Sequence, residues 1–176
     1  MRDGSGMSYH HGDLRRAMTA AAATAVAERG PTGLSLRELA RLAGVSHAAP
    51  AHHFGDKAGV LTAVAAEGFT LLASALAEAG DDLLAAGLAY VVFAVDHPGH
   101  FAVMFDSSLL HPDDAELRAA EQASASALEG LTPDADTARA AWSVAHGFAS
   151  LWLSGALSGP DVVEAAKPVL RQVARP

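Results

Sequence analysis

Cysteine is absent from the 176-residue chain, so neither disulfide bonds nor zinc sites with thiolate ligands are available to it. Aromatic residues are also scarce, at 6% of the sequence. No apolar run reaches the length of a membrane-spanning helix, and no charged segment followed by an apolar leader opens the chain. These absences predict a cytoplasmic protein without a membrane partner.

The short motifs of common enzyme classes are missing as well. The sequence has no Gly-x-Ser-x-Gly elbow, no phosphate-binding glycine loop after a strand and no His-Glu-x-x-His pair. Acidic and histidine residues are present, but none form a pair at catalytic spacing. We therefore predict that the protein is not an enzyme and needs no cofactor.

Two groups of polar residues resemble metal sites only superficially. The pair His10 and His11 stands at a helix start, where adjacent side chains point in different directions, so contacts to a flanking phosphate or plain solvent exposure are better readings. The second group flanks turns at spacings that match no standard site. Its members are His97, His100, Asp106 and His111. We predict no metal site.

Alanine, leucine and valine dominate the sequence, and this composition predicts an all-α fold of one or two domains. Charge is unevenly spread within the net −8: residues 1–60 carry +2, and residues 61–176 carry −10. Five of the nine histidines also lie in the first sixty residues. A mildly basic N-terminal module on an acidic body fits a nucleic-acid reader, although chance segregation in an acidic protein gives the same pattern.

The segment 34–61 predicts two short helices joined by a tight turn, followed by a long helix. Ser35 stands at an N-cap position with Glu38 three residues later, which is the spacing of a capping box. Gly44 supplies the turn, and we expect Ser46 to cap the second helix. Asp56 is expected to cap the next one. Two helices around a glycine turn are the geometry that places the second helix in the major groove of DNA.

Residues 36–61 resemble the DNA-binding domain of TetR-type transcriptional regulators. Their sequence is LRELARLAGVSHAAPAHHFGDKAGVL, with His53, Phe54 and Lys57 at the positions that match the family. The start of the chain, YHHGDLRRA, is similar to the same family. One position departs from it: Ala51 stands where the family usually has a phosphate-contacting tyrosine. That contact should be missing or be taken over by His52.

The resemblance implies a helix-turn-helix domain over residues 8–56 (the motif itself over about 35–54), a connecting helix over 57–80 and a regulatory and dimerisation domain over 81–176. We predict nine helices in all. The eighth is expected over about Pro133–Leu157 with Thr132 as its cap, and the last over about Asp161–Ala174. Residues 1–6 are polar and glycine-containing, and we expect them to be disordered.

The candidate DNA-binding residues fall into two roles. Ser35, Arg37 and Lys57 suit phosphates, whereas the start of the recognition helix suits base edges. The full set is Ser35, Arg37, Ser46, His47, Ala48, Ala49, His52, His53 and Lys57. Because the recognition helix has no Arg, Lys, Asn or Gln, direct readout should be modest, with more reliance on DNA shape.

The run Trp142-x-x-x-His146-Gly147 resembles the C-terminal domain of the TetR subgroup named for its Trp-His-Gly trio. We expect a close helix approach to compensate for the glycine inside a helix. The large side chains of the body are candidates for a ligand cavity, and ordinary core packing is the alternative for each. These are Tyr90, Phe93, Phe101, Met104, Phe105, Trp142 and His146. His146 in particular suits a structural hydrogen bond.

In the family, the last two long helices pair with those of a second subunit. The candidate seam is Ala149, Leu153, Ala156, Val162, Val163, Ala166, Val169 and Leu170. The resemblance thus implies a homodimeric repressor that binds a pseudo-palindromic double-stranded operator and releases it when a small, mostly apolar effector binds. The alternative is a helical ligand-binding or scaffold dimer whose helix-turn-helix no longer reads DNA.

Overall fold

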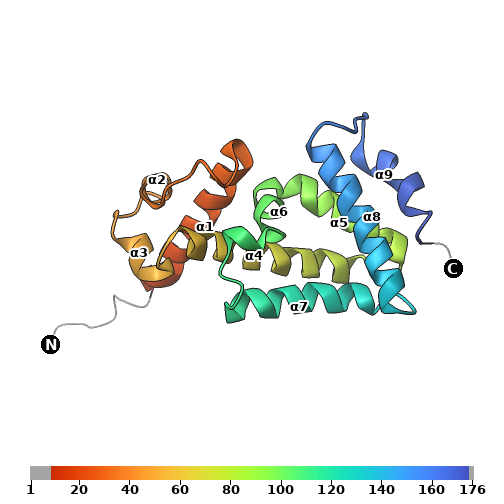
Figure 1. Cartoon of the computed structure of the whole chain (residues 1–176), viewed down its shortest axis with the longest axis horizontal. Helices are drawn as coiled ribbons and strands as arrows, with labels where there is room; N and C mark the ends of the chain where they lie inside the picture. The colour runs from red at the N-terminus through yellow and green to blue at the C-terminus, as the bar shows by residue number, and fades with distance from the viewer. Residues whose placement is uncertain (1–8, 175–176) are drawn as a thin grey trace. The chain divides into compact units, whose positions relative to one another are not determined.

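The computed structural model describes the backbone of residues 9–174 and the side chains from residue 14 onward. Over this range the protein is all-α, with nine α-helices, one 3-10 helix and no strand (Figure 1). The all-α prediction is therefore confirmed. The expectation for residues 1–6 and the side chains of His10 and His11 lie outside the described residues.

The first four helices are α1 (Tyr9–Arg29), α2 (Leu36–Leu42), α3 (Ala49–Phe54) and α4 (Lys57–Glu78). Helix α1 ends at Gly30, whose φ of 73° is the left-handed conformation that glycine adopts without steric cost. Helix α4 is long and apolar enough to cross a membrane by length and composition alone. However, 61% of its most apolar window is buried inside the protein, as in the core helix of a globular fold.

The remaining elements are α5 (Leu83–Asp96), α6 (Pro98–Met104), η1 (Ser107–Leu109), α7 (Ala115–Glu129), α8 (Ala135–Leu153) and α9 (Val162–Leu170). Helix α8 begins later than predicted, because the cap is Asp134, which accepts from the backbone N–H of Thr137 at 2.7 Å, and not Thr132. It ends four residues before the expected Leu157. Helix α9 likewise ends at Leu170, where we expected Ala174.

The chain folds into two compact units. Among the described residues, one contains the chain up to Ala66 together with Gly99–Leu117, and the other contains Glu67–Pro98 together with residues 118–174. Each unit is therefore built from two separate stretches of sequence. The segment that contains α6 and η1 belongs to the same unit as the helix-turn-helix, although α4 and α5 separate the two in the sequence.

The core of the first unit holds fully buried side chains from α1, α2, α4 and α6, among them Met18, Leu39, Val64 and Val103. At the start of α6 the backbone passes unusually close to α1. A Cβ built on Gly99 would come within 1.9 Å of the carbonyl oxygen of Ala23. Only glycine permits this approach, and it anchors α6 directly on α1.

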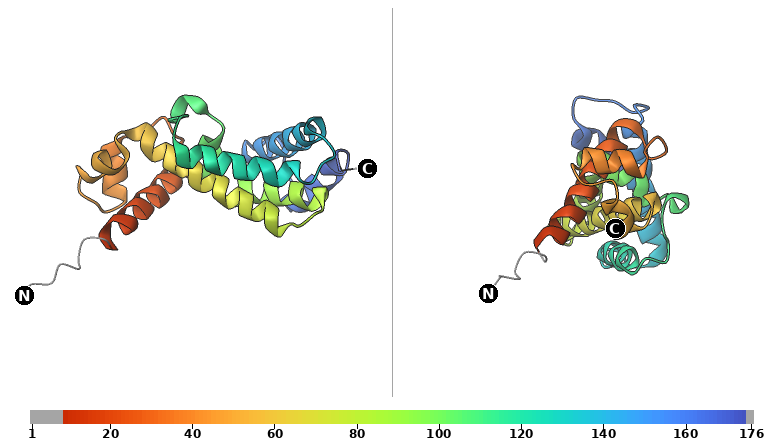
Figure 2. Two further views of the ribbon diagram at one scale, coloured as in Figure 1. Left: turned by 90° about the horizontal axis from the view of Figure 1, so that it is seen from below. Right: turned by 90° about the vertical axis from the view of Figure 1, so that its left-hand side faces the viewer.

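The second unit is organised around α5, which packs against both α8 and α9 (Figure 2). Helices α8 and α9 also pack on each other. Gly87 of α5 lies against the side chain of Leu170, since a Cβ there would meet Leu170 Cδ2 at 3.3 Å. Small residues on α5 and α8 thus allow three helices to share one core.

Candidate nucleic-acid interface

Helix α2 begins at the predicted cap. The Ser35 hydroxyl oxygen accepts a hydrogen bond from the backbone N–H of Glu38 at 3.3 Å. In a full capping box the Glu38 side chain would also accept from the backbone N–H of Ser35. Here the Glu38 carboxylate instead forms an ion pair with Arg29 at the end of α1. This pairing with Arg29 holds the pKa of Glu38 below its ordinary value. The cap therefore fixes α2 both to its own start and to α1.

The turn between α2 and α3 is closed by glycine in the left-handed conformation. Gly44 has φ of 68°, its N–H donates to the carbonyl of Arg41 at 3.2 Å, and the N–H of Val45 donates to that of Ala40 at 3.0 Å. This pair of bonds is a Schellman motif, which satisfies the last carbonyls of a helix. The tight turn that the sequence predicts at Gly44 is thus present.

Helix α3 starts later than the sequence indicates. Its N-cap is Ala48, which has no side chain able to cap, and Pro50 occupies the first turn. The prediction that Ser46 caps α3 is wrong. Ser46 instead contributes its backbone carbonyl, which accepts from the N–H of Ala49 at 3.1 Å and closes a turn before the helix.

One face of the turn and of α3 is open to solvent. One of its residues lies in the turn, and the other three stand at the N-cap of α3 and three and four residues later, so these three share one side of the helix. The four residues are His47, Ala48, Ala51 and His52. Ser46 is also exposed, Ala49 is half-buried, and Pro50 faces the core. The side of α3 that could enter a groove therefore carries methyl and imidazole groups and no fixed charge.

The cations expected to bind phosphates lie at the edges of this motif. Ser35 and Arg37 are exposed at the start of α2. Lys57 is half-buried at the start of α4, and its ammonium donates to the carbonyl of Thr32 at 3.2 Å. Lys57 thus joins the connection before α2 to the start of α4, a structural role that its position in the sequence did not suggest.

The inner side of α3 packs on α1. The guanidinium carbon of Arg15 lies 5.8 Å from the centre of the Phe54 ring, within the range of a cation–π contact. Arg15 also forms an ion pair with Glu116 at the start of α7. His53 is half-buried, and its ring neighbours that of His52 at 5.2 Å between centroids. Phe54 of α3 therefore packs against Arg15 of α1.

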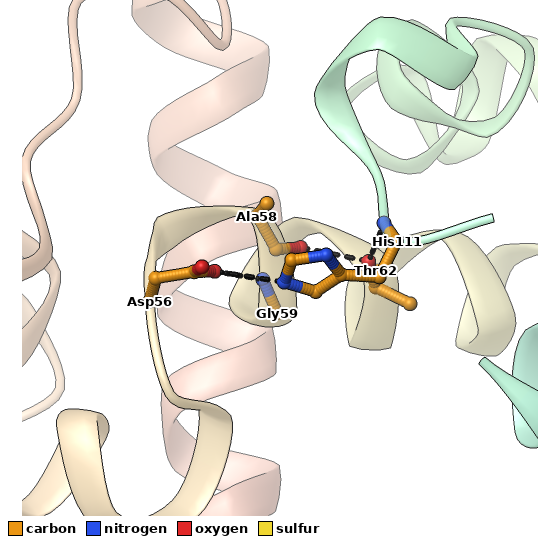
Figure 3. A network of polar contacts seen from close by, with 5 residues as sticks. All are labelled: Asp56, Ala58, Gly59, Thr62 and His111. Atoms are coloured by element: carbon orange, nitrogen blue, oxygen red, sulfur yellow. Dashed lines mark hydrogen bonds and ion pairs between the residues drawn. The ribbon is translucent and has the colours of Figure 1, made fainter. Parts of the chain in front are cut away.

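A polar network joins the start of α4 to the loop before α7 (Figure 3). Asp56 Oδ1 accepts from the N–H of Gly59 at 2.8 Å, as expected of a helix cap, and lies 3.0 Å from His111 Nε2. The His111 N–H donates to Thr62 Oγ1 at 2.8 Å, and that hydroxyl donates to the Ala58 carbonyl at 2.8 Å. The bonds from Gly59 and then from His111 hold the pKa of Asp56 below its ordinary value.

No local sequence signal marks this network, because its two sides lie about fifty residues apart. Gly59 is also required by the backbone, since a Cβ there would come within 1.9 Å of the Phe54 carbonyl oxygen. The network attaches residues 107–111 to the first turn of α4. The bonds of His111 thus join the loop before α7 to both the cap and the second turn of α4.

The candidate ligand residues fall into two groups, one in each compact unit. Phe101, Met104 and Phe105 belong to α6 and the residue after it, where the Phe101 and Phe105 rings lie 5.7 Å apart in an edge-to-face arrangement. Phe101 and Met104 are buried, whereas Phe105 is 38% exposed. These residues therefore belong to the unit that contains the helix-turn-helix.

The other four candidates lie in the second unit on α5 and α8. Tyr90 and Phe93 are buried, and the Tyr90 hydroxyl lies 2.9 Å from His146 Nδ1. The indole N–H of Trp142 donates to the same hydroxyl at 3.3 Å. Burial raises the pKa of Tyr90 well above its ordinary value and lowers that of His146, so both groups are neutral near pH 7. His146 thus takes part in the structural hydrogen bond expected of it.

Because the Tyr90 oxygen accepts from Trp142, its own hydrogen can be donated to His146 Nδ1. The proton of the neutral imidazole then resides on Nε2. Trp142 is 39% exposed, so this three-residue cluster extends from the core towards solvent.

Gly147 does not have the neighbour that the sequence predicts. A Cβ built there would meet no heavy atom within 4 Å, so the expected close helix approach is absent from the described part of this chain. The buried face of α8 is formed by Ala138, Ala141, Ala145, Phe148 and Ala149. Gly147 is not part of this buried face, and the space beside its Cα is open.

The candidate dimer residues differ in exposure. Ala149, Ala166 and Leu170 are buried within the chain's own core, whereas Val162 and Val163 are half-buried. The remaining three, Leu153, Ala156 and Val169, are exposed. Two further exposed leucines that the sequence analysis did not single out, Leu151 and Leu157, lie on and just after α8. Large apolar side chains thus gather at the end of α8 and on α9.

Among the described residues, no three His, Asp or Glu side chains are grouped so as to hold a metal ion. Of the set drawn from the sequence, His111 bonds with Asp56, and the ring of His97 lies 5.2 Å from that of Phe93. Asp106 accepts from the N–H of Ser108 at 3.1 Å and caps the 3-10 helix. These residues serve caps and packing.

Comparison with known families and structures agrees with this architecture. Residues 19–64 match the family model for bacterial regulatory proteins of the tetR family, and residues 83–174 match that for the tetracyclin repressor-like C-terminal domain. No curated protein sequence matches the chain.

Three solved structures illustrate the likeness. A protein of unknown function from Rhodococcus sp. RHA1 is 34% identical, with 97% of this chain and 100% of that chain covered and a TM-score of 0.75. The TetR family transcriptional regulator PfmR from Thermus thermophilus is 20% identical over 91% and 94%, with a TM-score of 0.69. The fatty acid degradation regulator FadR from Bacillus halodurans is 13% identical over 99% and 97%, with a TM-score of 0.74.

Proposed function

Because this chain belongs to the TetR family of DNA-binding transcriptional regulators, we propose that it is a ligand-responsive, homodimeric repressor. It acts in the cytoplasm as a regulator and not as an enzyme. Two subunits present their α3 helices to successive major grooves of a pseudo-palindromic operator. The observation that carries the proposal is the exposed face of α3, which follows a capped α2 and the closed turn at Gly44.

Phosphate contacts supply the affinity in this proposal. Arg37 and Ser35 lie exposed at the start of α2, and Lys57 lies half-buried at the start of α4, so they stand before and after α3 in the chain. Backbone contacts of this kind position a protein on the duplex without carrying sequence information. His52, exposed next to Ala51, takes the place of the phosphate contact that the missing tyrosine would make.

The second subunit packs on the exposed apolar side chains of α8 and α9. Leu151 is 49% exposed and Leu153 39%, both on the last turns of α8, and Val169 on α9 is 40% exposed. Large apolar groups gathered in this way mark association surfaces more often than free surface. The open space over Gly147 is where a partner helix can approach closely.

The effector binds in the C-terminal domain, close to Tyr90, Trp142 and His146. A neutral imidazole, an indole and buried aromatic rings suit a small, mostly apolar molecule with one hydrogen-bonding group. The effector releases DNA only if it binds the DNA-incompetent state more tightly than the DNA-bound state, because a ligand with equal affinity for both shifts nothing.

The first test is selection of bound sequences from a pool of random duplex DNA by the purified full-length protein. Recovery of an inverted repeat supports both the dimer and the regulator. Retention of no sequence above background at low salt, by a protein that is still dimeric, would overturn DNA binding. It would leave a helical ligand-binding or scaffold dimer, for which Ala51 and the uncharged α3 are the supporting features.

A further inference from the structure

The outward face of the turn and α3 has an unusual chemical composition for a surface that reads DNA. It consists of two methyl groups, from Ala48 and Ala51, and two imidazoles, from His47 and His52. Between Ala43 and Asp56 the chain has no Arg, Lys, Asn or Gln. This face therefore has none of the side chains that pair bidentately with guanine or adenine in the major groove.

The two methyl groups have a defined placement. Ala48 and Ala51 stand three residues apart, so their Cβ atoms lie one above the other on the same side of the helix. Pro50, which lies between them in the sequence, is buried, and its burial fixes which side of α3 faces the core. The Ala48–Ala51 pair is consequently held on the surface by the packing of its neighbour.

In the major groove, the apolar feature of a base pair is the 5-methyl group of thymine. Contact between an alanine methyl and a thymine methyl removes apolar surface of both from water, and small side chains let the helix backbone approach the bases closely. The imidazoles can each donate to or accept from a polar atom of a base, whereas the two methyl groups form the apolar part of the face.

Resting on the DNA-binding function proposed above, we propose that each operator half-site is recognised through thymine 5-methyl groups that contact Ala48 and Ala51. The operator class is then a half-site with thymines at the positions facing the recognition helix. Thymine is read here as an apolar shape and not through its hydrogen-bonding edge.

The test uses the inverted repeat recovered by selection and replaces each half-site thymine in turn by uracil, which lacks only the methyl group. Affinity is measured by fluorescence anisotropy with the full-length protein at fixed ionic strength, because salt alone changes it strongly. We expect a loss of about fourfold for each contacted methyl group, the equivalent of exposing one buried methylene. The other thymines should show no change.

A second substitution separates the methyl group from hydrogen bonding. Cytosine at a contacted thymine position should weaken binding, and 5-methylcytosine there should recover part of the loss, since it restores the methyl group but not the thymine O4 acceptor. If uracil binds as well as thymine at every half-site position, the inference is overturned while the regulator function stands. If no operator is recovered, the proposed function itself has failed.

The variants Ala48→Gly and Ala51→Gly assign the contact to these two residues. In each variant the thymine-to-uracil ratio should fall towards one at the base that its methyl contacts. Because the ratio is measured within one protein, a change in folding or overall affinity cancels. Ala48 is the N-cap of α3 and makes no capping bond with its side chain, and glycine is favoured over alanine at this position, so this variant remains folded even if Ala51→Gly does not. A ratio unchanged in both variants would overturn the assignment.

Discussion

Asp56 combines a helix cap with a contact to a distant loop, and the two roles can be separated by substitution. Its carboxylate accepts from the Gly59 N–H and lies beside His111. Asp56→Ala should lower the free energy of unfolding by about 1 kcal/mol, as loss of an N-cap does. Asp56→Asn keeps the cap but removes the charge, so it should cost less. Chemical denaturation at pH 7 compares the two.

The same residue predicts a pH dependence. The folded-state pKa of Asp56 lies below its ordinary value of 3.8, so the carboxylate stabilises the fold above that pH, and this stabilisation is lost as pH falls through the lowered pKa. Asp56→Asn should therefore flatten the decrease of melting temperature at acidic pH. Asp81→Asn, at an exposed position between α4 and α5, is the control. Equal slopes for Asp56→Asn and the wild-type protein would contradict the assignment.

Two glycines inside helices should respond in opposite ways to alanine. Gly59→Ala forces a Cβ towards the Phe54 carbonyl oxygen and should destabilise the protein by about 1–3 kcal/mol. Gly147→Ala meets open space and should stabilise α8 by up to about 1 kcal/mol through helix propensity. Thermal unfolding at one protein concentration measures both.

The Gly147 variant also reports on the second subunit. If a partner helix lies over this position, Gly147→Ala should weaken the dimer, which sedimentation at decreasing concentration would detect. An unchanged dimer with a more stable fold would place the subunit contact elsewhere on α8 and α9.

At the scale of elements, the helix-turn-helix has a cationic side chain at the start of α2 and another at the start of α4. The contribution of each to DNA affinity can be measured. Arg37→Ala and Lys57→Ala should each weaken binding to all sequences and reduce the slope of log affinity against log salt. The reduction is about 0.9 for each phosphate contact removed. Lys57→Ala should also lower stability, since the ammonium donates to the Thr32 carbonyl. Lys167→Ala on α9 is the matched control. An unchanged salt slope for both variants would rule out these phosphate contacts.

The sequence predicted best the elements whose signals are local. Ser35 caps α2, Gly44 closes the turn and Asp56 caps α4, because each side chain acts within four residues of itself. Starts and ends were less accurate. Ser46 and Thr132 looked like caps, but Ala48 and Asp134 occupy those positions, since the preceding residues form turns of their own.

Contacts between residues far apart in the sequence could not be predicted from sequence patterns. The pairs His111 with Asp56 and Tyr90 with His146 join residues separated by 55 and 56 positions. Neither has a spacing that distinguishes it from other histidines and carboxylates of the chain. The expectation for Gly147 failed for a related reason, because a helical glycine signals a close neighbour without saying whether that neighbour belongs to the same chain.

At the scale of the whole molecule, assembly should depend on the exposed leucines at the end of α8. Leu151→Glu and Leu153→Glu place a charge on surfaces that are 49% and 39% exposed in one subunit and buried in the proposed dimer. Burying an unpaired carboxylate is costly, so both variants should be monomeric at micromolar concentration and lose operator affinity. Analytical ultracentrifugation measures the change.

Ala77→Glu, at an exposed position of α4, is the control for adding charge to a helix surface. It should remain dimeric and bind the operator like the wild-type protein. Dimers in both leucine variants would show that the subunits associate through another face.

The discontinuous first unit has a consequence for biosynthesis. Residues up to Ala66 depend on Gly99–Leu117 for the contacts of Gly99 with α1 and of His111 with α4. During synthesis the chain leaves the ribosome from its N-terminus, and domains fold as units when their residues are available. The packing of the nascent helix-turn-helix is therefore complete only after Leu117 has left the ribosome. By then the first stretch of the second unit has already emerged. The capacity to bind DNA therefore arises late in translation, although the residues proposed to contact DNA are made first.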